Sequence, residues 1–101
     1  MAEEKLTNAQ KRAAEADIVA RIKEAALATS GVHGLKKPSR AALSDAGTVT
    51  CDVYPVVEYG VKIPAVAWDV QENVKQTVEA ATPYSVVAVN ISVLGVHVPK
   101  H

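Results

Sequence analysis

Two extended stretches with a helical stretch between them constrain the fold of this chain most strongly. From Thr48 to Tyr59, apolar and polar residues alternate with the period of two that is typical of a half-buried strand. The segment from Ile63 to Ala81 follows, and its apolar residues recur with the period of an amphipathic helix. From Tyr84 to Val98 the chain is again extended, with Val87, Val89, Ile91 and Val93 alternating against polar or smaller residues. The second half therefore predicts a strand, a helix and another strand.

These two periods assign side chains to faces. The first strand is predicted to direct Val49, Cys51, Val53 and Val57 inward, and Thr50, Asp52, Tyr54 and Glu58 outward. The helix is predicted to bury Ile63, Ala67, Val70, Val74, Val78 and Ala81. Pro64 suits the first turn of this helix. Pro55 lacks the N–H that a strand ladder needs, which predicts an edge position or a bulge.

The first half of the chain predicts one more helix, from about Asn8 to Thr29. Thr7 and Gln10 have the spacing of a capping box, although Asp17 could equally cap a shorter helix. The segment has no internal Gly or Pro, and Gly31 stands where a helix ends in the left-handed conformation. The residues that share one face of this helix are Ile18, Ile22, Ala25 and Thr29.

The remaining segments complete the predicted fold. Val32–Leu35 predicts a short strand, and Lys36–Gly47 predicts a loop, with a helical turn around Arg40–Leu43 as the alternative. The order is then α-β-β-α-β, in a single small α+β domain with two helices packed on one face of a three-stranded sheet. We place this domain at residues 17–98, preceded by a polar segment, 1–16, that is helical or frayed, and followed by a frayed tail, 99–101.

The charge and the apolar content limit the classes of function. Eleven basic residues balance eleven acidic ones, so we expect no nucleic-acid binding. Lys36, Lys37 and Arg40 form the main basic cluster, which is typical of a solvated loop. The N-terminus has no apolar signal segment, and no apolar run reaches the roughly 18 residues of a membrane span. We therefore expect a cytoplasmic protein without direct membrane insertion.

Several segments of the chain resemble the alkaline shock protein family, the general stress proteins of Gram-positive bacteria. Val57-Glu58-Tyr59-Gly60 followed by Ile63-Pro64 is similar to the strand-to-helix turn of the family, and Val70–Lys75 to its helix centre. Val89–Val93 followed by Gly95-Val96 is similar to its last strand. Ile22–Leu35, with Gly31-Val32, is similar to its first helix and the exit from it. The segment 36–47 matches no family motif, and Pro83 stands where a Gly is expected after the helix.

The resemblance implies a function as well as a fold. It implies a stress-response protein linked to cell-envelope homeostasis, in a family with no known catalytic residues. It also implies action through protein–protein contacts, as an adaptor or a self-associating homo-oligomer. Some relatives are held at the membrane by a separate small membrane protein, so the resemblance implies a position at the inner face of the membrane through such a partner.

The residues that carry chemistry elsewhere predict no enzyme, cofactor or metal site here. Cys51 is a lone cysteine on an inward strand position, which is typical of a small core residue. His33, His97 and His101 are too scattered in the sequence to predict a metal site or a base for Cys51. Gly31-Val32-His33-Gly34 matches the G-x-x-G of KH-type RNA-binding domains, so a KH-like RNA-binding module is the alternative function. A helix end followed by a turn explains the two glycines more simply.

Trp68 is the residue most indicative of a binding surface. Helical spacing places it off the inward stripe, beside Gln71, Glu72 and Lys75. An exposed Trp is a favoured interface anchor, while a ring lying flat over the edge between helix and sheet is the alternative. Tyr54 and Val56, on the outer face of the first strand, would extend the surface.

Overall fold

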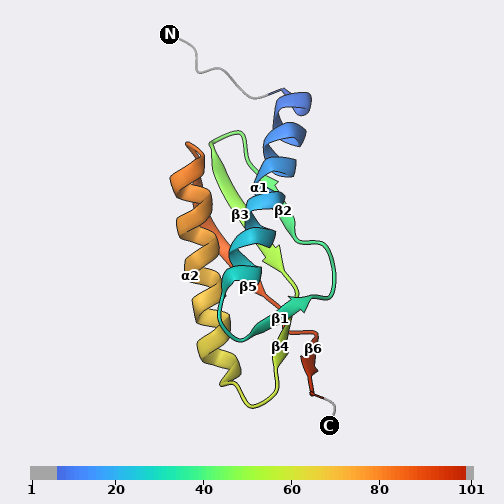
Figure 1. The fold of residues 1–101 in the computed structure, drawn as a ribbon. Coiled ribbons are helices and arrows are strands. Elements are labelled where there is room, and N and C mark those ends of the chain that lie inside the picture. Colours follow the sequence, from blue (N-terminus) through green and yellow to red (C-terminus); the bar gives the residue numbers. More distant parts are fainter. Residues whose placement is uncertain (1–6, 100–101) are drawn as a thin grey trace.

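Residues 7–99 are described by the computed structural model of this protein, and they form two helices and six strands (Figure 1). In chain order these are α1 (Asn8–Ala28), β1 (Val32–Leu35), β2 (Arg40–Leu43), β3 (Thr48–Val53), β4 (Pro55–Glu58), α2 (Ile63–Ala81), β5 (Ser85–Ile91) and β6 (Gly95–His97). The α+β class and the predicted order of helices and strands are confirmed. The start of the predicted polar segment (1–6) and the end of the tail (100–101) lie outside the described residues.

The strands form two sheets where the sequence predicted one. In the larger sheet, of order β2-β3-β5, β3 is antiparallel to β2 and parallel to β5. In the smaller sheet, of order β1-β4-β6, β4 is antiparallel to β1 and parallel to β6. Each long predicted strand is broken once, at Tyr54 and at 92–94, and so contributes one strand to each sheet. Figure 1 shows the two helices side by side on one face of the larger sheet, with the smaller sheet near the end where α2 begins.

Helix α1 begins and ends as its sequence indicates. The Thr7 side chain accepts a hydrogen bond from the Gln10 N–H, and the Gln10 side chain accepts one from the Thr7 N–H, which confirms the capping box. The predicted inward residues of this helix are all buried: Ile18, Ile22, Ala25 and Thr29. The Thr29 hydroxyl donates to the Ala25 carbonyl and accepts from the Asn73 amide of α2, at 2.9 and 2.8 Å, so it links the two helices.

Helix α2 buries a row of valines spaced four residues apart, Val66, Val70, Val74 and Val78. The centre of the predicted stripe is therefore correct, but its two ends are not, because Ile63 and Ala81 are exposed and Val66 is buried instead. Residues four apart form a row that is inclined to the helix axis, and this row packs against α1 and β5. Neither helix of the described chain is long and apolar enough to cross a membrane.

The strand faces agree with the alternation except where pairing or a bulge changes them. The four inward residues predicted before α2 are all fully buried, and Pro55 is buried too, as the first residue of the central strand β4. The predicted edge or bulge position for Pro55 is therefore wrong, because the start of a strand also tolerates a missing donor. In β5 the register shifts so that Thr50 pairs with Ala88, which leaves Val87 exposed and buries Val86 and Val89.

The predicted loop 36–47 contains the strand β2, so neither the loop nor the helical turn is correct at 40–43. Arg40-Ala41-Ala42-Leu43 has no strong strand pattern of its own and is extended because it pairs in full register with β3. The Leu43 N–H also donates to the Glu15 carboxylate of α1 at 2.9 Å, which ties this outer strand to the helix above it.

Candidate functional site

The strand β5 forms an uncovered edge of the larger sheet. It pairs with β3 on one side and with no other strand of the described chain. Its sequence, Ser85–Ile91, carries no charged side chain, and Val87 is 62% exposed at its bulge. The Val86 N–H donates to the Glu79 carboxylate at 2.9 Å, so one backbone group at the start of this edge is satisfied by α2. A strand edge with free backbone groups is a template for pairing with another chain.

Helix α2 runs along this edge and places polar side chains beside it. Gln71, Glu72 and Lys75 line a groove of about 90 Å³ together with residues 86–89 of β5. Trp68 lies one turn earlier on α2 and is 59% exposed, so its ring does not cover the core. The structure thus brings together four of the predicted interface residues with one that the sequence did not indicate, Val87. We call these five residues, Trp68, Gln71, Glu72, Lys75 and Val87, the α2–β5 face.

The other two predicted interface residues lie elsewhere. The Tyr54 ring lies 5.5 Å from the Lys37 ammonium, beside a pocket that Arg40 of β2 also lines. Strand β2 is the opposite edge of the sheet from β5. Val56 belongs to the smaller sheet and lies between Gly34 and Gly95 of the adjacent strands. Neither residue extends the α2–β5 face.

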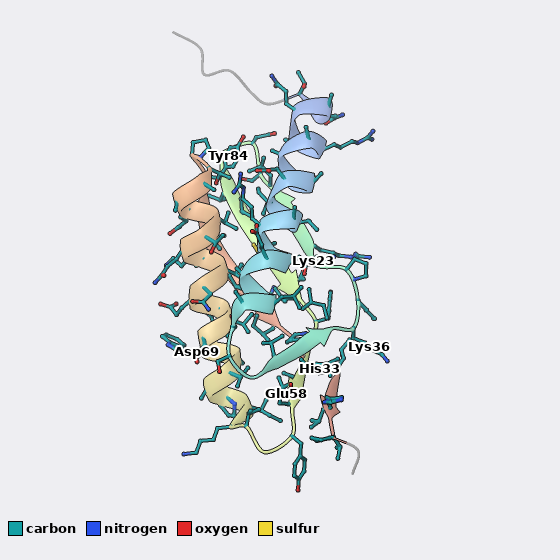
Figure 2. All side chains as sticks on the ribbon, viewed as in Figure 1. Lys23, His33, Lys36, Glu58, Asp69 and Tyr84 are labelled. Atoms are coloured by element: carbon teal, nitrogen blue, oxygen red, sulfur yellow. The ribbon has the colours of Figure 1, made fainter. Side chains whose placement is uncertain are left out.

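A basic pocket lies between α1 and the segment after β1. Lys23, Lys36 and Lys37 line a space of about 320 Å³, and Figure 2 shows Lys23 and Lys36 on the same side of the molecule. Ser39 also lines the pocket, and its buried hydroxyl has no hydrogen-bond partner among the described residues. The predicted basic cluster is therefore exposed, as expected for solvated lysines, but it surrounds a concave site.

Cys51 has the environment of a core residue. It is fully buried and belongs to the main hydrophobic cluster. Burial raises the pKa of its thiol to about 11, and the charge of the adjacent Asp52 raises it further in the same direction. A thiol held in its neutral form is a poor nucleophile, in agreement with the prediction that Cys51 is a core residue.

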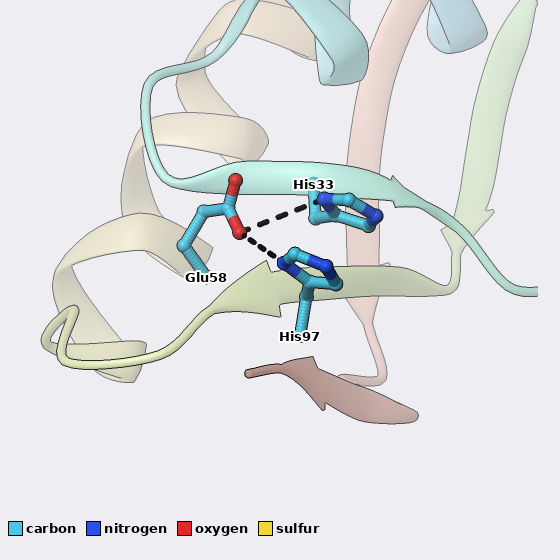
Figure 3. Close-up of side chains that lie close together, drawn as sticks. All are labelled: His33, Glu58 and His97. Atoms are coloured by element: carbon cyan, nitrogen blue, oxygen red, sulfur yellow. Dashed lines mark hydrogen bonds and ion pairs between the residues drawn. The ribbon is translucent and has the colours of Figure 1, made fainter. Parts of the chain in front are cut away.

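Two of the three histidines meet in the smaller sheet, so the prediction that they are too scattered to share a site is wrong for His33 and His97. Their rings stack with centroids 3.7 Å apart and an interplanar angle of 3°. The Glu58 Oε1 atom lies 3.0 Å from His97 Nδ1 and 3.5 Å from His33 Nδ1 (Figure 3). The sequence gave no local signal for this group, because the three residues come from three different strands. His101 lies outside the described residues.

The G-x-x-G segment does not have the setting of an RNA clamp. Gly31 ends the turn after α1 with a φ of 92°, and Gly34 lies within β1. The segment thus leads from a helix into a strand, and the Glu58 carboxylate lies beside its His33. A negative charge at that position opposes phosphate binding.

Comparison with known proteins gives one family match and several relatives. The sequence model of the alkaline shock protein family, described as having a cell envelope-related function, matches residues 40–98. The uncharacterized protein YqhY of Bacillus subtilis is 45% identical over 64 residues, which are 63% of this chain and 45% of YqhY. The uncharacterized protein Spy1535 of Streptococcus pyogenes is 41% identical over 54 residues, which are 54% of this chain and 42% of Spy1535. The chain therefore spans less than half the length of these curated relatives.

Solved structures of the MamM CTD share the fold. One of them matches with a TM-score of 0.56 and 20% identity, over 84% of this chain and 95% of that one. Another, titled a nickel form, matches with a TM-score of 0.55 and 21% identity, over 84% of this chain and 99% of that one. At this identity the similarity shows a common fold and no common function.

Proposed function

Because this chain belongs to the alkaline shock protein family, with its cell envelope-related function, we propose that it is a non-catalytic protein of the envelope stress response. In this proposal it acts in the cytoplasm through protein–protein contacts, near the membrane through a partner such as a small membrane protein. The observation that carries the proposal is the α2–β5 face, which combines an exposed Trp68 with an uncharged and unpaired strand edge. An exposed Trp beside free backbone donors and acceptors supports an interface more than a solvated surface.

The occupant that best fits this face is a second copy of the same chain. A two-fold contact places the same surface on both sides, so the surface must complement itself. Glu72 and Lys75 provide this, because in an antiparallel arrangement of two α2 helices each Glu72 can meet the Lys75 of the other copy. The formal net charge of zero also leaves no overall repulsion between two copies.

The strand edge supports the same arrangement. Antiparallel pairing of two β5 edges would join two three-stranded sheets into one and satisfy backbone groups that otherwise face water. Because α2 packs over β5, this pairing also brings the two α2 helices alongside each other. Val87, pushed outward by its bulge, would lie within the contact.

Sedimentation velocity over a range of concentrations tests the proposal. The wild-type protein should show a dimer, and Trp68→Ala and Val87→Lys should shift it to monomer without changing the far-UV circular dichroism spectrum. Leu27→Lys is the matched control, because Leu27 is an apolar residue of α1 that is 44% exposed outside this face. This control variant should remain dimeric.

A charge exchange makes the test specific to the two-fold arrangement. Glu72→Lys should weaken the dimer by placing like charges opposite each other, and Glu72→Lys combined with Lys75→Glu should restore it. A wild type that stays monomeric at every concentration would overturn self-association. A dimer that survives both Trp68→Ala and Val87→Lys would show that the contact lies on another surface.

A further inference from the structure

The group His33, Glu58 and His97 on the smaller sheet lies outside the α2–β5 face and has no part in the proposed function. We propose that these three residues form a binding site for a divalent transition-metal ion of the Zn²⁺ class. Each offers one ligand atom, and these atoms all lie within 4.8 Å of one another. Two imidazoles and one carboxylate make up a ligand set that Zn²⁺ takes in proteins.

The backbone, and not a chance meeting of flexible side chains, places these residues together. Glu58 pairs directly with His97 across the parallel ladder of β4 and β6, and the Tyr59 N–H donates to the His97 carbonyl at 2.9 Å. On the other side, the Glu58 N–H donates to the Gly31 carbonyl at 2.9 Å. His33 lies at the irregularity in the register between β1 and β4. Figure 3 shows the three side chains on the same side of the sheet, with Glu58 facing both rings.

The distances are close to those that a bound ion requires. Bonds of about 2.0–2.1 Å to a tetrahedral Zn²⁺ place its ligand atoms roughly 3.3 Å apart. The two Nδ1 atoms lie 3.0 and 3.5 Å from the same Glu58 oxygen. The parallel stack must open by side-chain rotation so that both nitrogen lone pairs point at one ion. The side chains of His33 and His97 are 45% and 41% exposed, which leaves them free to rotate.

The ligand types select the kind of ion. Imidazole nitrogen favours Zn²⁺, Ni²⁺ and Cu²⁺, whereas Mg²⁺ and Ca²⁺ favour sites made of oxygen alone. Three protein ligands leave a fourth position for water or for a group of another molecule. The Glu58 carboxylate contributes the negative charge that offsets part of the charge of the ion.

The site also has a structural consequence. Its three ligands come from β1, β4 and β6, so one ion would bridge all strands of the smaller sheet. Strand β6 has three residues and is paired only with β4, so it has the least to hold it in place. An ion that binds the folded state alone stabilises it by mass action. We therefore expect Zn²⁺ to raise the temperature of unfolding and to order the segment that contains β6.

The test is titration of untagged, chelator-treated protein with Zn²⁺ alone by isothermal calorimetry, and by thermal unfolding with Mg²⁺ in parallel. Zn²⁺ should bind with one-to-one stoichiometry and raise the melting temperature, and Mg²⁺ should do neither. His33→Ala, His97→Ala and Glu58→Gln should each weaken binding by at least about tenfold, the lower end of what even supporting residues contribute to metal sites. Co²⁺ in place of Zn²⁺ should give the visible absorption of a tetrahedral ion.

Control variants separate this site from other binding modes. His101→Ala removes the third histidine of the chain, and Asp69→Asn removes a carboxylate on α2, so both should keep the wild-type affinity. Trp68→Ala should keep it too, whatever that variant does to association. If a ligand variant unfolds, the imidazole NMR signals of the wild type replace it, and those of His33 and His97 should shift together on addition of Zn²⁺. No saturable binding, or binding that depends on His101 and not on His33 and His97, would overturn the proposal.

Discussion

Gly31 should be the least replaceable glycine of the chain. It has a φ of +92°, and a Cβ placed on it would lie 2.8 Å from a methyl group of Val66. Gly31→Ala therefore adds two costs, a left-handed backbone and an overlap with a buried side chain of α2. The left-handed conformation costs about 1–2 kcal/mol for a residue with a Cβ. Overpacking in a well-filled core adds typically about 1–3 kcal/mol.

Two other glycines separate these costs. Gly60 has a φ of +90°, but a Cβ on it would meet nothing within 4 Å, so Gly60→Ala should cost only the backbone part, about 1–2 kcal/mol. Gly34 has neither a positive φ nor a close neighbour. Gly34→Ala should thus be neutral or slightly stabilising, because alanine restricts the unfolded chain. The expected order of destabilisation is Gly31→Ala, then Gly60→Ala, then Gly34→Ala, with a total of about 2–5 kcal/mol for the first.

Urea unfolding followed by far-UV circular dichroism measures these differences. Fluorescence is the poorer probe, because Trp68 is already 59% exposed in the folded protein. A double-mutant cycle with Val66→Ala isolates the overlap, since Gly31→Ala should cost less when Val66 is already shortened. Equal destabilisation by Gly31→Ala and Gly60→Ala, with no coupling to Val66, would refute the close approach of the turn to α2.

The remaining predictions concern the core, alkaline pH and RNA. Val74→Asp should unfold the domain, because losing a buried valine costs about 1.5–3 kcal/mol and an unpaired buried carboxylate costs several more; Gln76→Asp on the exposed face is the control, and near-native melting of Val74→Asp would contradict the helix phase. The pKa of Cys51 is raised from 9.0 to about 11, so the folded state keeps a proton that the unfolded state loses; stability present below pH 9 should fall by about 2–3 kcal/mol by pH 11, and urea midpoints of Cys51→Ala should fall less steeply. RNA should bind weakly at physiological salt and dissociate as salt rises; filter binding should be unaffected by Gly34→Asp, and tight, salt-resistant binding lost in that variant would favour the KH-like function.

The elements that could be predicted are those whose own residues specify them. Both helices carry their caps, their period and their terminators in sequence, as the Thr7–Gln10 capping box and the start of α2 near Pro64 show. The alternation of β3 and β4 likewise predicted which side chains are buried. Such features depend on neighbours within about one turn of helix or a few residues of strand, so they survive without knowledge of the tertiary structure.

What could not be predicted depends on partners that are distant in sequence. Arg40–Leu43 is a strand because β3 lies beside it, and no local pattern distinguishes it from a loop. The breaks at Tyr54 and after Ile91 divide each long strand between two sheets, which is a property of how the sheets are arranged. The bulge at Val87 reverses the faces of the residues around it, and one inserted residue is invisible to an alternating pattern.

The same distinction explains the G-x-x-G segment. As a string it indicates a phosphate clamp, because the string alone shows two glycines and no surroundings. In the fold, Gly31 is there because Val66 approaches it closely, and His33 between the glycines stacks on His97 from the far end of the chain. Glu58, which the alternation placed outward without a role, supplies the charge that faces both rings. A carboxylate beside two imidazoles attracts a cation, so the chemistry at this segment is the opposite of the chemistry that its motif suggests.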